Sequence, residues 1–225
     1  MSTITKQALN FLEQLEDNNN REWFNENKAE FKSLQNEVKS FCNTVFNTLN
    51  THDEIDGFKM FRIYRDVRFS KNKAPYKAHF SASFNRTKPK LRGGYYIQIK
   101  PGNKSFIATG FWDPSKTDLL RIRKEFETDD QEIRDILANK SFNKIWGNTF
   151  NGDELKTAPR GFNKTHPAID LIKKKQFILT KHYTDKAVLS NNFIDDVSSS
   201  FKAIRPFFNY MSDVLTTNLN GESII

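Results

Sequence analysis

Hydrophobic residues recur every three or four positions at the N-terminal end of the chain, which is the period of an amphipathic helix. Two such segments lie within residues 1–50, and the second runs from Phe31 to Leu49. The motif NNNREWF between them is typical of a capped helix start, with Asn20 as the cap and two aromatic residues at the corner. The pattern therefore predicts a helical region over residues 1–50.

From about residue 60 the period changes to two, as in β-strands. The turn signal Pro101-Gly102-Asn103 indicates a hairpin, and the connections are too short for the crossovers of a parallel sheet. The pattern predicts an antiparallel meander in a sheet-forming region over residues 60–111. Its strands are expected at Phe61–Phe69, Phe80–Phe84, Tyr95–Ile99 and Ser105–Phe111.

The helical period returns in the second half of the chain and predicts helices over residues 114–147. One more strand and a long C-terminal helix, kinked by Pro206, are expected within residues 175–219. No internal repeat or linker separates these parts. The sequence therefore predicts one α+β domain over residues 1–225, with a central antiparallel sheet of about five strands and N- and C-terminal helices packed on it.

Composition adds a view of the core and of the compartment. The chain has 225 residues, of which 21 are Phe, so large flat rings are expected to fill much of the core. Cys42 is the only cysteine, which excludes an intramolecular disulfide and a cysteine zinc site. Because neither a signal-peptide pattern nor an apolar run of about 20 residues is present, a cytoplasmic protein without membrane association is predicted.

The charge is concentrated in one part of the chain. The total is +8, but residues 61–100 hold eleven bases and a single acid, Asp66. That segment therefore carries +10 and the other residues together carry −2. Such a local excess favours a binding role over a role in solubility, and it makes an anion the expected partner.

One face of the predicted strand over residues 61–69 is polar, with side chains about 7 Å apart. Asp66 lies between two arginines and is suited to orient both guanidinium groups toward a planar oxyanion. The alternative is an ion-pair ladder on a solvated face of the sheet. That alternative does not account for Lys71, Lys73 and Lys77, which have no acidic residue near them in the sequence. This face carries Arg62, Tyr64, Asp66 and Arg68.

Arg65 lies on the apolar face of the same strand, where it either finds a partner inside the fold or forms the floor of a pocket. The following loop, SKNKAPYK, mixes bases with Tyr76, whose ring is expected to stack on a base or sugar. A solvated hairpin tip is the alternative for this loop. The candidate ligand-binding residues are Arg62, Tyr64, Arg65, Arg68, Lys73, Tyr76 and Lys77.

Acid–base chemistry has its own candidates. The loop APRGFNKTHP carries Arg160 and His166, and if it folds over the basic strand these two residues and Asp66 would surround an anion. The alternative is a turn in which Gly161 has a positive φ and His166 caps the helix that starts at Pro167.

Metal and cofactor signals are missing from the sequence. The four histidines show no metal-ligand spacing, and the patterns GxxxxGK[ST], GxGxxG and GxSxG are absent. Neither a metal nor a cofactor is therefore expected.

Several longer strings carry a family resemblance. FRIYRDVRFSKNKAPYK, GYYIQIKPG, FWDPSKTDLLRIR and LKTAPRGFNKTHPAIDLIKKKQF, together with NNNREWF, are similar to the domain of unknown function 2461 family over nearly the whole chain. Membership implies one α+β domain and a cytoplasmic location. It implies no activity.

The function predicted from these residues is the binding of a phosphate-bearing ligand, a nucleotide or a nucleic acid, on a basic surface of sheet and hairpin. Two alternatives stay open. One is an enzyme acting on a small phosphorylated or carboxylated substrate, and the other is a protein-interaction module with exposed Phe. The oligomeric state is open as well.

Overall fold

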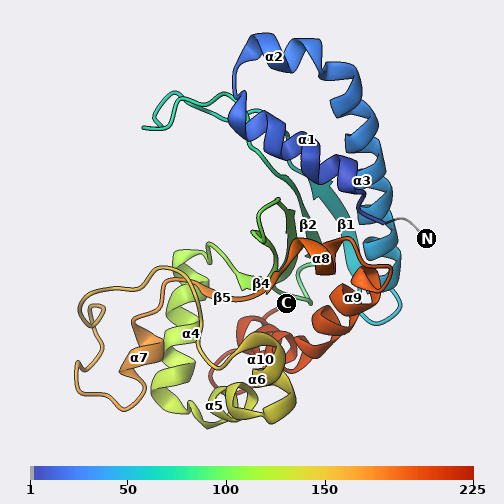
Figure 1. The fold of residues 1–225 in the computed structure, drawn as a ribbon. Helices are drawn as coiled ribbons and strands as arrows, with labels where there is room; N and C mark the ends of the chain where they lie inside the picture. The colour runs from blue at the N-terminus through green and yellow to red at the C-terminus, as the bar shows by residue number, and fades with distance from the viewer. Residues whose placement is uncertain (1–2) are drawn as a thin grey trace. The chain divides into compact units, whose positions relative to one another are not determined.

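The fold is built around a five-stranded antiparallel sheet with helices packed on it. The computed structural model describes residues 3–225 of the chain. Strands that follow each other in sequence are neighbours in the sheet (Figure 1). The α+β class and the antiparallel meander are thus confirmed. The strands are β1 (Ile55–Met60), β2 (Phe80–Arg86), β3 (Gly94–Ile99), β4 (Ser105–Phe111) and β5 (Phe177–Tyr183).

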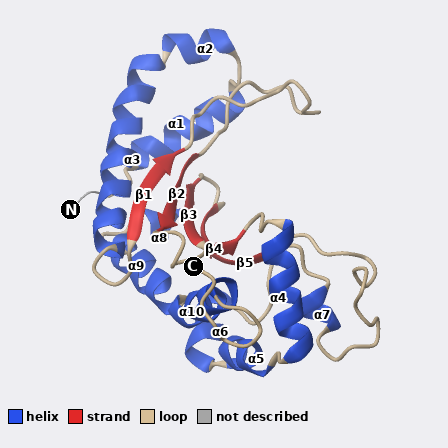
Figure 2. Cartoon of the chain, turned by 180° about the vertical axis from the view of Figure 1, so that it is seen from behind, coloured by secondary structure: helices blue, strands red, loops and turns tan. Residues whose placement is uncertain are grey.

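Ten helices are found within residues 3–225, and Figure 2 shows them in blue against the red strands. Three of them precede the sheet, four connect β4 to β5 and three follow β5. They are α1 (Lys6–Asp17), α2 (Arg21–Glu26), α3 (Lys28–Leu49), α4 (Lys116–Thr128), α5 (Gln131–Ala138), α6 (Lys140–Trp146), α7 (Ile169–Ile172), α8 (Asp185–Val188), α9 (Phe193–Ala203) and α10 (Arg205–Thr216).

Two predicted elements are corrected by the structure. The strand expected over Phe61–Phe69 does not form, and β1 lies immediately before it. In the extended segment only a single antiparallel bridge joins Tyr64 to Tyr76. The long C-terminal helix is two helices rather than one kinked helix, because Pro206 occupies the first turn of α10, where its missing N–H costs nothing.

The chain divides into two compact units, each described here by itself. Unit 1 comprises Met1–Phe84, Tyr96–Ile107 and His182–Ser199, and unit 2 comprises Asn85–Tyr95, Ala108–Lys181 and Ser200–Ile225. The expectation of one domain over residues 1–225 stays a prediction. No helix within residues 3–225 is long and apolar enough to cross a bilayer.

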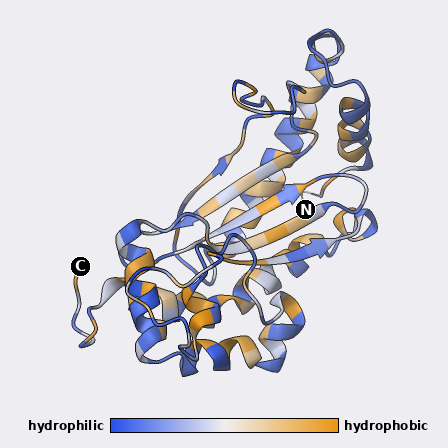
Figure 3. Ribbon diagram, turned by 90° about the vertical axis from the view of Figure 1, so that its left-hand side faces the viewer, coloured by the Kyte–Doolittle hydropathy of each residue, from blue (hydrophilic) through white to orange (hydrophobic). Residues whose placement is uncertain are grey.

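The core of unit 1 lies between the N-terminal helices and the sheet. α1 and α3 each bury one apolar stripe, and α3 packs against β1. Figure 3 shows the matching alternation of hydrophobic and hydrophilic residues around the helices. Aromatic rings dominate this core, as predicted from composition: Phe31 contacts the rings of Phe11, Phe24 and Phe80 at centroid distances of 5.1–6.1 Å.

Unit 2 has a basic residue at the centre of its core. Arg86 is 1% exposed, and its Nη1 donates to the carbonyl of Arg92 at 2.8 Å and to Ser212 Oγ at 3.2 Å. The guanidinium carbon lies 5.0 Å from the centroid of the Phe208 ring. Arg86 belongs to the basic segment of the sequence, yet it is a structural residue.

Replacing Arg86 with Met is expected to lower the free energy of unfolding by about 2–4 kcal/mol, because the buried Ser212 hydroxyl and the partly buried Arg92 carbonyl lose a charged donor. The Arg86→Lys variant should have a free energy of unfolding between those of the wild type and Arg86→Met, since an ammonium group keeps the charge but not the planar fork. The measurement is urea unfolding. Lys88→Met, at an exposed position nearby, is the control and should change stability by less than about 0.5 kcal/mol.

Candidate anion-binding site

The segment between β1 and β2 forms an arm on unit 1. Residues 61–79, called the basic hairpin from here on, run out and back with few backbone pairs: Arg65 N–H donates to the Pro75 carbonyl at 2.9 Å and Lys77 N–H to the Ile63 carbonyl at 2.8 Å. In Figure 1 it is the teal loop that projects away from α1 and α2. The hairpin was predicted, but with a regular first strand that it lacks.

Asn19, in the NNNREWF motif, holds the base of the basic hairpin. Tyr76 N–H donates to Asn19 Oδ1 at 3.0 Å, and Asn19 Nδ2 donates back to the Tyr76 carbonyl at 3.1 Å. These are the two backbone groups of Tyr76 that the hairpin's own pairing leaves unused. The next residue, Asn20, caps α2 as predicted by accepting from Trp23 N–H at 2.9 Å.

Ring stacking adds to this attachment. The Tyr76 ring stacks on Phe24 with centroids 4.0 Å apart and planes 18° apart, and Tyr64 meets Phe24 edge-on at 5.9 Å. Tyr76 is 3% exposed. The expected role of Tyr76 as a stacking platform is therefore corrected: its ring face is covered by Phe24, and the residue fastens the hairpin instead.

A hollow of about 460 Å³ lies where the basic hairpin meets α1 and β3. Four of its lining side chains are cationic or can become so: Arg65, Lys77, His79 and Lys100. Glu16 is the one carboxylate in the wall, and it accepts a hydrogen bond from Lys100 at 2.8 Å. This basic hollow is lined by Glu16, Asn19, Arg65, Asn72, Ala74, Tyr76, Lys77, Ala78, His79 and Lys100.

The charges of the basic hollow act on each other. Burial and the positive charges of Lys77, Lys100 and Arg65 lower the pKa of His79 from 6.5 to about 4, against a small opposing effect of Glu16. Burial, with Arg62 and Arg65 nearby, also lowers the pKa of Lys77. His79 is therefore a neutral imidazole at pH 7, able to donate one hydrogen bond.

A second, smaller hollow of about 210 Å³ borders the same hairpin on the α3 side. Lys28 and Lys32, one turn apart on α3, stand beside Arg62, and aromatic and aliphatic groups form the floor. This lysine hollow is lined by Phe24, Lys28, Phe31, Lys32, Gln35, Arg62, Ile63 and Tyr64.

Asp66 orients one arginine rather than two. Its carboxylate accepts from Arg68 Nη2 at 2.7 Å and from Arg68 Nε at 3.0 Å, and these bonds lower its pKa. Both side chains are solvent-exposed, so the pair adds little to stability. Arg62 makes no hydrogen bond to Asp66 and faces the lysine hollow instead.

The other predicted binding residues are divided between the base and the tip of the hairpin. Arg65 and Lys77 join the basic hollow and Tyr64 joins the lysine hollow, while Lys73 donates to the Val67 carbonyl at 3.0 Å near the tip. Within the described residues 3–225, five bases of this segment have no carboxylate at ion-pair distance. They are Arg62, Arg65, Lys71, Lys73 and Lys77.

Some basic residues that have no acidic residue near them in the sequence form ion pairs with distant residues in the structure. Arg92 pairs with Asp118 at 2.6 Å in unit 2, and Lys100 pairs with Glu16 in unit 1. Sequence-local counting overlooks such pairs because the acids lie 26 and 84 positions away. The basic surface is therefore smaller than the +10 segment and is centred on the hairpin.

Phe69 is a residue that the sequence pattern misplaced. The strand prediction puts it on the apolar face with Ile63, but it is 97% exposed beside the exposed bases Arg68 and Lys71. The only available signal was its position between two basic stretches near the turn. Its ring, unlike that of Tyr76, is open to solvent.

The candidates for acid–base chemistry belong to different units. Asp66 lies in unit 1, and Arg160 and His166 lie in unit 2, so their meeting around one anion stays a prediction. In unit 2 part of the alternative turn is observed: Gly161 has a φ of +87°, and His166 Nδ1 accepts from Ala168 N–H at 3.1 Å. The helix expected from Pro167 begins at Ile169 instead, and among the described residues no side chain caps it. Within residues 3–225 no cluster of three or more His, Cys, Asp or Glu is arranged to hold a metal ion.

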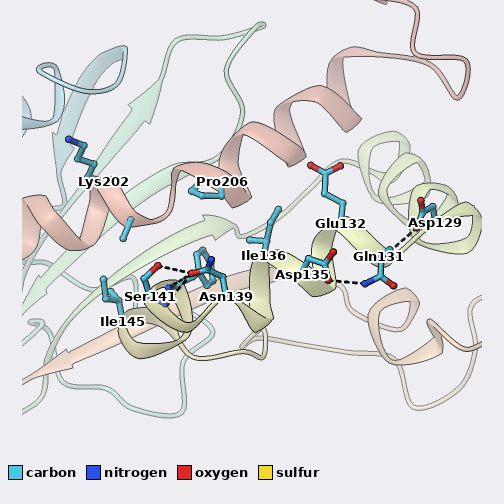
Figure 4. A pocket seen from close by; sticks show the side chains of 12 residues that line it. Asp129, Gln131, Glu132, Asp135, Ile136, Asn139, Ser141, Ile145, Lys202 and Pro206 are labelled. Atoms are coloured by element: carbon cyan, nitrogen blue, oxygen red, sulfur yellow. Dashed lines mark hydrogen bonds between the residues drawn. The ribbon is translucent and has the colours of Figure 1, made fainter.

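Another hollow, of about 740 Å³, lies in unit 2 among α5, α6 and the corner between α9 and α10 (Figure 4). Its polar lining carries Asp129, Glu132 and Asp135 against a single base, Lys202. None of the predicted binding residues lines it. An acidic lining repels anions, so this hollow is unsuited to the expected ligand.

Fold and site together define an α+β protein with a five-stranded antiparallel sheet and a cationic hollow beside a projecting hairpin. The chain belongs to the DUF2461 family: the family described as conserved hypothetical protein (DUF2461) matches residues 7–210. The resemblance found in the sequence is thereby confirmed. Comparisons with curated proteins and with solved structures gave no match.

Replacing Asn19 with Ala should detach the hairpin base, because both Tyr76 backbone groups lose their partner. We expect a loss of about 1–3 kcal/mol in urea unfolding and faster hydrogen exchange at the Tyr76 amide. Asn25→Ala, on exposed α2, is the matched control and should leave both unchanged. Unaltered exchange at Tyr76 in the Asn19 variant would contradict the role given to this side chain.

His79 should titrate near pH 4 in a histidine NMR titration. Because the unfolded chain binds this proton at about 6.5, the free energy of unfolding should fall as the pH drops from about 6.5 to about 4. Lys77→Met should raise the His79 pKa by removing a neighbouring positive charge, whereas Lys39→Met should not. A wild-type pKa near 6.5 would show that the cations do not crowd the imidazole.

Proposed function

We propose that this protein binds a phosphate-bearing ligand in the basic hollow of unit 1. The observation that carries the proposal is the convergence of Arg65, Lys77, His79 and Lys100 on one hollow whose only carboxylate is already bonded to Lys100. Burial lowers the pKa of Lys77 and His79, and the neighbouring positive charges lower it further, so an anion placed there relieves the repulsion among these charges. The free energy of that relief favours binding.

The chemistry of the wall suits phosphate in particular. Arg65 offers a planar fork that matches two phosphate oxygens, and Lys77 offers a mobile point charge. Neutral His79 supplies a donor without adding charge. The volume of about 460 Å³ falls within the range of about 300–1,000 Å³ that is typical of ligand pockets, and a nucleotide is of suitable size.

The proposed function predicts that inorganic phosphate or pyrophosphate raises the His79 pKa, because a bound negative charge stabilises the imidazolium. We expect Arg65→Met and Lys77→Met each to weaken pyrophosphate binding at least about tenfold, as the loss of a charge-assisted hydrogen bond implies. Full-length protein is titrated at constant ionic strength, and binding is followed by the His79 NMR signal and by calorimetry.

Lys39→Met removes an exposed charge from α3 and serves as the control, with wild-type affinity expected. Hydrogen exchange at the Tyr76 amide shows whether each variant keeps the hairpin attached. Pyrophosphate that leaves the His79 signal unmoved, or that moves it equally in the Arg65→Met/Lys77→Met double variant, would contradict the proposed function.

A further inference from the structure

The exposed large hydrophobic residues of unit 1 are all aromatic and all lie in the basic hairpin. Among the described residues of this unit they are Phe61, Tyr64 and Phe69, with exposures of 37%, 47% and 97%. A single exposed ring is ordinary on a protein surface. Here three rings within nine residues, interleaved with basic residues, remain exposed in one short segment.

Two of these rings contact other aromatic rings while remaining exposed to solvent in part. Tyr64 contacts Phe24 at 5.9 Å and Tyr76 at 5.4 Å, and Phe61 contacts Tyr96 at 6.0 Å with Lys77 Nζ 5.7 Å from its centroid. A ring fixed in place loses little conformational entropy when a ligand stacks on it. Phe69 differs, since it extends from the tip without burying its ring.

Cations line both hollows that border the basic hairpin. The basic hollow provides Arg65 and Lys77, and the lysine hollow provides Lys28, Lys32 and Arg62. No carboxylate within residues 3–225 pairs with any of these five side chains. A ligand with one phosphate occupies one hollow and leaves the other unused, whereas a chain of phosphates uses both.

We infer that the phosphate-bearing ligand is a single-stranded nucleic acid that follows the basic hairpin, with phosphates at the two hollows and bases stacked on Tyr64 and Phe69. The inference rests on the proposed function and names its ligand class. Cationic grooves combined with aromatic platforms are the usual means of binding single strands without sequence preference. In a duplex the base faces are covered by their neighbours, so the rings would find nothing to stack on.

An anionic membrane is the other macromolecular surface that attracts basic side chains and an exposed Phe. The observations favour a strand because Arg65 and Lys77 are half-buried in a hollow, where a flexible chain reaches them and a flat lipid surface does not. The strand also explains the side-by-side placement of Tyr64 and Arg62 in the lysine hollow.

The test is fluorescence anisotropy of a labelled oligo(dT) of about 12 nucleotides with full-length protein, in a salt series and beside a duplex of the same length. We expect affinity to rise with strand length and log K to fall with log salt by about 0.7 per phosphate contacted. Tyr64→Ala and Phe69→Ala should each weaken binding about 5- to 150-fold, the cost of losing one stacked base.

Phe69→Leu is the decisive variant, because Leu keeps the apolar bulk but has no ring face. It should weaken oligo(dT) binding as strongly as Phe69→Ala. Both variants should keep the pyrophosphate-induced shift of His79, since Phe69 does not line the basic hollow. Lys39→Met should bind oligo(dT) like wild type.

The outcomes separate the two proposals. Failure of oligo(dT) to bind at low salt while pyrophosphate still shifts His79 overturns the single-strand inference and leaves the proposed function standing. Equal binding of duplex and single strand, unaffected by Phe69→Leu, overturns it in favour of simple charge attraction. Binding to phosphatidylserine vesicles without binding to oligo(dT) overturns it in favour of a membrane. If neither pyrophosphate nor oligo(dT) binds, both proposals are overturned.

Discussion

The candidate site depends on one interaction, the attachment of the hairpin at Tyr76 to the connection between α1 and α2 and to α2 itself. The side-chain amide of Asn19 bonds both backbone groups of Tyr76, and Phe24 covers the ring. An extended arm without a sheet neighbour leaves backbone groups unsatisfied, which costs free energy when they are shielded from water. Asn19 replaces the missing neighbour, and this allows a poorly paired hairpin to keep its cations in one place.

Crowded positive charge is the second constraint on unit 1. Burial and the nearby charges of Lys77, Lys100 and Arg65 lower the pKa of His79 to about 4, so its imidazole is neutral at pH 7. Repulsion of this kind destabilises the fold, and of these three cations Lys100 alone has a carboxylate partner within residues 3–225, namely Glu16. In unit 2, by contrast, Arg86 has its guanidinium bonded and covered by a ring. The same residue type therefore serves packing in one unit and leaves a charge available in the other.

Sequence patterns located most of the fold, and the strand predicted over residues 61–69 shows where such patterns fail. The periods of 3.6 and 2 found the N-terminal helices, four of the five strands and the antiparallel order. α1, α3 and β3 each bury one face, which produces the clearest periods, whereas β4 is buried on both faces. Residues 61–69 alternate like a strand, but Ile63 is buried while Phe69 is exposed. Alternation predicts which residues share a face. It does not say whether a neighbouring strand or a core is present to cover that face.

The sequence by itself determined the α+β class, the family, the concentration of basic charge at residues 61–100 and the capping role of Asn20. The class, the charge and the cap follow from local periodicity and composition, which need no knowledge of distant neighbours, and the family follows from the resemblance of the quoted strings. Only the tertiary structure decided that Tyr76 is buried, that Phe69 is exposed, and that Lys28 and Lys32 stand beside Arg62. It likewise selected Arg65, Lys77, His79 and Lys100 as one group. The physical reason is that pairing, burial and repulsion depend on distances in space. Whether a charged side chain has an ion-pair partner is decided by residues many positions away in the sequence.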